Sequence, residues 1–220
     1  MNADGAQGFI GADFDRLLSR ASFAKTTILI AIAFFAMVMV GEFGELFGFI
    51  DVNSAELDTT VMIYAFVLIG FGVGFLISAI GVCMWIYRAH ATLRETGRED
   101  LEYSPGWAVG WFFIPFANLW MPYQAMRALW NESHLTDEGY GSEPPSGLGQ
   151  WWACWIGSNI LSNFTSPLTE ASDGSIVQIG FVLAIIANAL SIGSALLLYR
   201  IIESITQAQI TNLGAMQAFE

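Results

Sequence analysis

Charged residues are scarce in this sequence: 13% are Asp, Glu, Lys or Arg, whereas 55% are hydrophobic. Soluble domains carry about 25% charged residues, so the chain has too few to cover a surface that faces water. Only 8 residues are basic, against 20 acidic ones, and so few scattered cations do not form the basic patch that nucleic acid requires. The composition therefore argues against nucleic-acid binding and predicts that lipid surrounds much of the chain.

Cysteine and histidine are also rare, with two of each. Cys83 and Cys154 both lie in apolar stretches, which argues against a disulfide framework or a CxxC metal site and is typical of small buried apolar side chains. His90 and His134 fall in predicted loops, and no HExxH, GxSxG, Walker or GxGxxG pattern is present. We therefore expect no enzyme activity, no metal and no cofactor.

The first residues lack the positive charge of a secretory signal peptide. Asp4, Asp13 and Asp15 precede the first apolar stretch, so no cleaved leader is expected. Residues 12–24 instead have the spacing of an amphipathic helix, which we expect to lie on the membrane surface. Its apolar face comprises Phe14, Leu17, Leu18 and Ala21, and its polar face comprises Asp13, Arg16 and Arg20.

The sequence does contain long hydrophobic stretches. A helix needs about 20 mainly apolar residues to cross the hydrocarbon core of a bilayer. We predict four such spans, at residues 26–47, 60–87, 149–168 and 175–200. Glu42 and Glu45 interrupt the first span, and we expect them at its outer boundary. The alternative is a proton or cation site, because ionisable residues within spans are costly and often functional.

A further uncharged stretch, residues 103–126, is long enough to span but contains Pro105, Pro115 and Pro122. Each proline removes a backbone donor and clashes with the preceding helical turn. The prolines therefore predict a broken, re-entrant or interfacial helical hairpin at residues 104–131, and the alternative is a fifth span.

The positions of the basic residues and tryptophans favour four spans with a hairpin over five spans. With four spans, all 8 basic residues lie on the inner side, as the positive-inside rule predicts, whereas a fifth span would move Arg127 and Arg200 outside. All 8 tryptophans lie between positions 85 and 155, which four spans place near the inner boundary, where tryptophan is enriched.

The predicted fold is therefore an all-α integral membrane protein with four transmembrane helices and a proline-broken hairpin. Residues 1–25 form a cytoplasmic segment, residues 26–202 form the transmembrane bundle, and residues 203–220 form a cytoplasmic tail. We expect a multi-pass protein of the cell (plasma or inner) membrane with both termini in the cytoplasm.

Part of the sequence is similar to a known family. Residues 85–89 read WIYRA, residues 104–115 read SPGWAVGWFFIP, and NLW, PYQAM and LW follow at residues 118–120, 122–126 and 129–130. Together with Ile205, Thr206 and Gln209 near the end, this pattern resembles the bacterial membrane family called domain-of-unknown-function family 4328. The resemblance covers residues 60–210 and implies a membrane fold but no activity.

The hairpin is the strongest candidate site. Arg127 supplies a charge, and aromatic rings around it supply amphipathic contact with a lipid headgroup or a protein partner. The candidate binding residues are Asn118, Trp120, Tyr123, Gln124, Arg127 and Trp130, with Arg88 at the end of the second span. The alternative is an anchor that only fixes the depth of the chain in the membrane.

A second polar group lies within the last two predicted spans and comprises Asn159, Asn163, Asn188 and Ser191. Such side chains either join helices by hydrogen bonds or line a polar path. We therefore predict a binding or scaffold protein that engages membrane lipid, a protein partner or a second copy of itself at the inner leaflet. The alternative function is a small transporter or channel subunit.

Overall fold

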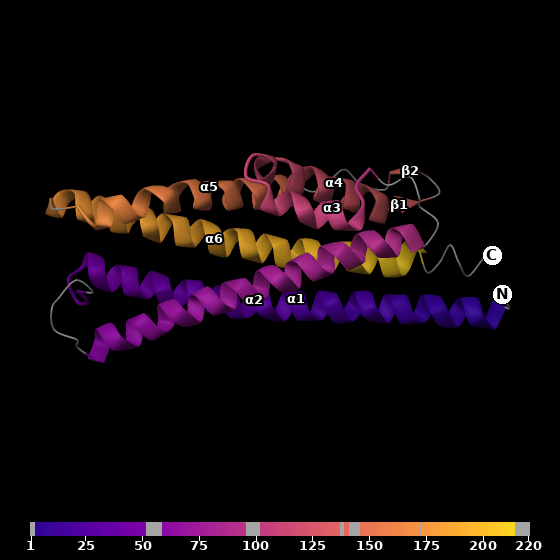
Figure 1. The fold of residues 1–220 in the computed structure, drawn as a ribbon, viewed down its shortest axis with the longest axis horizontal. Helices are drawn as coiled ribbons and strands as arrows, with labels where there is room; N and C mark the ends of the chain where they lie inside the picture. Colours follow the sequence, from indigo (N-terminus) through magenta and orange to yellow (C-terminus); the bar gives the residue numbers. More distant parts are fainter. Residues whose placement is uncertain are drawn as a thin grey trace. The chain divides into compact units, whose positions relative to one another are not determined.

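A computed structural model describes residues 3–51, 59–95, 102–136, 139–140, 146–171 and 173–213 of the chain. The main helices are α1 (Ala3–Leu46), α2 (Thr59–Glu95), α3 (Pro105–Gly110), α4 (Met121–Ser133), α5 (Ser146–Thr169) and α6 (Gly174–Ala208). Short helical turns lie at Trp111–Phe113, Ala117–Leu119 and Gln209–Leu213, and the two-residue strands β1 (Leu135–Thr136) and β2 (Gly139–Tyr140) pair antiparallel. The predicted all-α character is thus confirmed (Figure 1).

Three helices of the described part are long and apolar enough to cross a membrane. They cover Gly11–Leu46, Thr59–Glu95 and Gly174–Asn212, in agreement with the first, second and fourth predicted spans. Helix α5, the third predicted span, is not among them, and polar residues such as Asn159 and Asn163 interrupt its apolar sequence. The number of spans therefore stays a prediction.

Helix α1 differs from the sequence prediction in its length. A separate amphipathic helix was predicted at residues 12–24, but α1 continues unbroken from Ala3 to Leu46, because no proline interrupts it. Leu17 and Ala21 of the predicted apolar face are buried, whereas Leu18 is exposed, so the predicted face is buried only in part. Asp13 of the predicted polar face is buried too, because it forms an ion pair with Arg88.

The chain divides into two compact units. Unit 1 comprises Met1–Thr26, Ala79–Gly149 and Leu198–Glu220, and unit 2 comprises Thr27–Ser78 and Gln150–Leu197. Helices α1, α2 and α6 each contribute one part to both units.

Unit 1 contains a densely packed core. Among the residues that the structure describes, the largest fully buried side chains all lie in this unit: Leu17, Trp85, Ile86, His90, Thr92, Leu93, Met126, Leu129, Leu148, Ile202, Ile205 and Gln209. Trp85 also donates a hydrogen bond from Nε1 to Oγ1 of Thr206 at 3.1 Å, which satisfies a buried polar group, as burial requires.

Unit 2 is held by close helix contacts and aromatic side chains. Phe35 packs edge-on against Phe71 with ring centroids 4.9 Å apart, and Ser194 donates to the Trp151 carbonyl oxygen at 3.3 Å. Many of its large apolar side chains are nevertheless exposed, among them Val40, Ile63, Phe66, Ile69, Val73 and Leu76. In water this exposure would be unfavourable, but hydrocarbon solvates such a surface well.

The prolines of the predicted hairpin stand where helices start. Pro105 is the first residue of α3, whose N-cap Ser104 accepts a hydrogen bond from the Trp107 backbone N–H, and Pro122 lies in the first turn of α4. A proline fits there because its missing N–H has no helical partner in any case. Pro115 separates the two short turns. The broken helical structure at residues 104–131 is therefore confirmed, whereas its insertion into the membrane remains a prediction.

A glycine in unit 2 allows α5 and α6 to approach closely. A Cβ atom added at Gly180 would lie 2.8 Å from the Thr169 backbone nitrogen. We expect Gly180→Ala to lower the thermal unfolding temperature in detergent, because overpacking costs about 1–3 kcal/mol and exceeds the gain of about 1 kcal/mol in helix propensity. Gly72→Ala is the matched control, since nothing lies within 4 Å of an added Cβ there. Equal unfolding temperatures for the two variants would contradict the close contact.

Candidate functional site

The turn between α3 and α4 presents a row of apolar side chains to the surroundings. Phe113 and Phe116 are 74% and 79% exposed, and Trp107, Leu119 and Trp120 are exposed by more than half. We call these five residues the hairpin tip. No charged residue lies between positions 103 and 126. A group of exposed large apolar side chains in one uncharged segment is typical of a contact with lipid or with another protein.

The rest of the hairpin is fixed firmly within unit 1. The buried side of α4 contains Pro122, Ala125, Met126, Leu129, Trp130 and Ser133. Gln209, which follows α6, donates from Nε2 to Ser133 Oγ at 2.9 Å and to the Ala89 carbonyl oxygen at 3.2 Å. The buried amide thereby connects α4, α2 and the end of α6, so the hairpin tip is carried on a rigid base.

His134, directly after α4, also packs on this base. Its ring stacks on Trp130 with centroids 3.9 Å apart. Because a carbonyl oxygen can only accept, Nδ1–H donates to the Trp130 carbonyl oxygen at 2.9 Å, and Nε2 then accepts from the Ser204 hydroxyl at 3.4 Å. Burial lowers the pKa of His134, in agreement with this neutral form.

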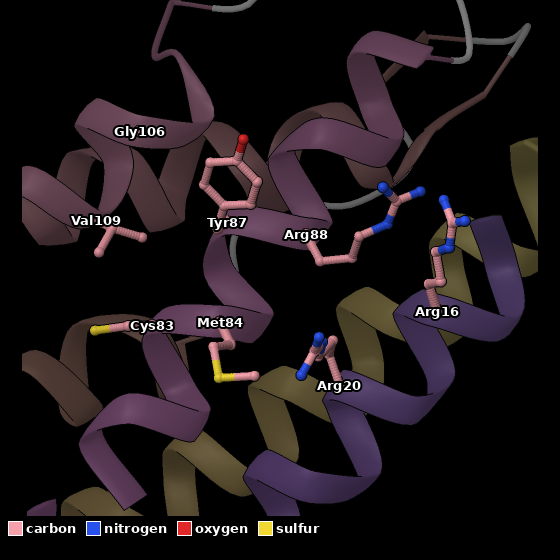
Figure 2. A pocket seen from close by; sticks show the side chains of 8 residues that line it. All are labelled: Arg16, Arg20, Cys83, Met84, Tyr87, Arg88, Gly106 and Val109. Atoms are coloured by element: carbon pink, nitrogen blue, oxygen red, sulfur yellow. The ribbon is translucent and has the colours of Figure 1, made fainter. Parts of the chain in front are cut away.

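A pocket of about 590 Å³ opens beside the hairpin within unit 1 (Figure 2). Its lining comes from α1, α2 and α3 and comprises Arg16, Arg20, Cys83, Met84, Tyr87, Arg88, Gly106 and Val109. Three arginines thus line one cavity together with apolar side chains. The volume lies in the range of small-molecule sites, and the lining suits a molecule with an anionic end and an apolar end.

The three arginines differ in how fully their charges are compensated. Arg88 pairs with Asp13 at 2.9 Å and with Glu95 at 2.7 Å, and its side chain is only 14% exposed. Arg16 pairs with Asp13 at 3.1 Å. Arg20 is exposed and has no carboxylate partner among the described residues. Arg20 is therefore the cation of this pocket that is most available to an anion.

The structure separates the predicted hairpin residues from the pocket. Of the predicted binding residues, only Arg88 lines it. Trp120, Gln124 and Arg127 are exposed, Asn118 and Tyr123 are half-buried, and Trp130 is buried. Trp120 belongs to the hairpin tip, whereas Trp130 belongs to the packed base.

Sequence reasoning missed Arg16 and Arg20 as pocket residues. The sequence did contain a sign of this pairing. Arg16 and Arg20 lie one turn apart on the polar face of the predicted amphipathic helix, and residues i and i+4 share a helix face. That face was assigned to solvent, since nothing in the sequence showed that α2 packs against it through Arg88 and Asp13.

The predicted polar interior is only partly present. Asn159 and Asn163 are exposed on α5, where each amide donates to the backbone carbonyl oxygen four residues earlier. Their assignment to the bundle interior was wrong, because a satisfied amide can face outward. Ser191 likewise bonds to its own helix, whereas Asn188 donates to Glu42 Oε1 at 2.7 Å.

The described residues contain no group of three His, Cys, Asp or Glu side chains that could hold a metal ion. Cys83 and Cys154 are free thiols and half-buried. The site chemistry of the described chain thus consists of cations, amides and apolar surface.

Comparison with known proteins gives a family but no activity. Neither the curated proteins nor the solved structures include a match to this chain. The sequence profile of the family described as "Domain of unknown function (DUF4328)" matches residues 50–207, which include α2, the hairpin, α5 and most of α6. This match covers more than half of the 220 residues, so the chain belongs to the DUF4328 family.

Proposed function

We propose that this protein binds an anionic lipid at the inner leaflet of the cell membrane and acts there as a lipid-dependent scaffold. The observation that carries the proposal is the pocket in which Arg16, Arg20 and Arg88 meet apolar side chains. A lipid phosphate group accepts several charge-assisted hydrogen bonds from guanidinium groups. The apolar part of the lipid would lie on side chains such as Met84 and Val109.

The charge distribution supports an anionic ligand. Asp13 and Glu95 offset two of the three positive charges, which leaves the charge of Arg20 for the ligand. Arg88 serves mainly to hold α1 against α2, because its guanidinium group pairs with a carboxylate from each of these helices. The lipid specificity therefore depends on Arg20, with Arg16 as a second donor.

The hairpin tip supports the location of the pocket at a leaflet. Phe113, Phe116 and Trp120 are exposed on a segment without charge, and aromatic side chains favour the membrane boundary.

The proposed topology predicts opposite labelling at two exposed positions. In a cysteine-free background (Cys83→Ala, Cys154→Ala), Arg127→Cys should react with a membrane-impermeant maleimide only after the cells are permeabilised. Phe49→Cys, between α1 and α2, should react in intact cells, because the positive-inside rule places that connection outside. Labelling of Arg127→Cys from outside would instead support five spans.

The proposed insertion of the hairpin tip predicts a lipid environment at Phe116. A spin label on Phe116→Cys, in the same background and in reconstituted bilayers, should be accessible to oxygen and shielded from a water-soluble nickel complex. Ser19→Cys, exposed on α1, is the matched control and should show the opposite accessibility. A nickel-accessible label at position 116 would contradict insertion.

The proposed ligand predicts a charge-dependent affinity. Arg20→Gln should weaken the binding of phosphatidylglycerol to the purified protein about tenfold, because hydrogen bonds to charged groups contribute about 1.5–3 kcal/mol. Native mass spectrometry with graded lipid measures this loss. Arg200→Gln, an exposed arginine that does not line the pocket, should bind like the original protein, and zwitterionic phosphatidylcholine should not respond to either change. Equal losses in both arginine variants would refute a specific site.

A further inference from the structure

A carboxyl group in unit 2 has no basic partner. Glu42 of α1 accepts a hydrogen bond at Oε1 from Asn188 Nδ2 of α6 at 2.7 Å. Its second oxygen, Oε2, is buried and has no hydrogen-bond partner among the described residues. Unit 2 contains no Lys, Arg or His in its sequence, so no cation of this unit compensates a charge on Glu42.

The position of Asn188 indicates how deep this carboxyl group lies. Residues 174–199 of α6 carry no charge. With a helical rise of about 1.5 Å per residue, Asn188 lies roughly 21 Å from Gly174 and roughly 17 Å from Tyr199. Half of the hydrocarbon core is about 15 Å thick. The hydrogen bond therefore places the Glu42 carboxyl group level with the middle of the apolar part of α6.

The other groups around Glu42 are neutral or acidic. Tyr64 of α2 lies close enough to interact electrostatically with both Glu42 and Glu45, and its ring packs directly on Gly41, where an added Cβ would overlap it. Asn188 faces Glu42 from α6, and Glu45 is the acidic neighbour on its own helix. An ionised carboxylate in these surroundings would be half-buried and without a counterion from this unit, which is more costly than the same burial of a neutral carboxyl group.

We propose that Glu42 is a proton-binding site within the membrane: it carries a proton at neutral pH in the folded protein, hydrogen-bonded to Asn188. The site is independent of the arginine pocket and does not rest on the proposed lipid binding. A single carboxyl group with one amide partner suits a proton rather than a metal cation, which takes several oxygen ligands.

Dicyclohexylcarbodiimide tests the proposal directly, because this apolar reagent reacts with protonated carboxyl groups in apolar surroundings. The acid adds across one C=N bond of the reagent: the carboxyl oxygen bonds to the central carbon, the proton moves to nitrogen, and the adduct rearranges to a stable N-acylurea. The full-length protein in bilayers should acquire this adduct on the peptide segment at Glu42, as mapped by mass spectrometry. Labelling should fall several-fold from about pH 6 to about pH 9 as the carboxyl group loses its proton.

Three variants make the outcome decisive. Glu42→Gln imitates the neutral form, so it should lose the adduct while its unfolding temperature stays unchanged. Asn188→Leu removes the donor that favours the anion, so labelling should persist to higher pH than in the original protein. Glu45→Gln should leave the labelling of Glu42 in place. Absence of the adduct at Glu42 throughout this pH range, equal labelling of Glu45, or labelling that does not fall with rising pH would overturn the proposal.

Discussion

The ion pair between Arg88 and Asp13 is the interaction on which unit 1 depends. A guanidinium group on an apolar helix requires a counterion, and Asp13 supplies it from α1 while Glu95 supplies a second one from α2 itself. Because the pair fixes which turn of α1 lies against α2, it also brings Arg16 and Arg20 to the pocket. Removing one member would leave a largely buried charge unpaired, which costs far more than the pair contributes. The main effect of the pair is therefore to fix how α1 is aligned along α2, and its contribution to the stability of the fold is smaller.

The hairpin was predictable from the sequence because prolines act locally. Pro105, Pro115 and Pro122 restrict the backbone wherever they stand, so the breaks at α3 and α4 followed from position alone. The pocket depends instead on residues far apart in the chain, such as Arg20 and Val109, whose proximity no spacing rule encodes.

The faces of the membrane helices were harder to assign. A helix that is apolar all round has no polar face to orient it, so the sequence could not tell that Asn159 and Asn163 face outward whereas Asn188 contacts another helix. The length of α1 was hard to predict for a related reason, since a change from amphipathic to apolar composition at residue 26 does not by itself end a helix.

The distribution of charge between the units bears on how the chain is held across an energised membrane. All 8 basic residues belong to unit 1, whereas the charged residues of unit 2 are all acidic. Unit 1 also holds 13 acidic residues and unit 2 holds 7, so the formal net charges are -5 and -7. In the proposed orientation, an inside-negative membrane potential therefore repels unit 2 from the inner side more strongly than unit 1. Each elementary charge moved across the membrane contributes about 2.3 kcal/mol per 100 mV. The excess of negative charge in unit 2 would thus oppose inversion of the protein, because inversion would bring more negative charge to the inner side.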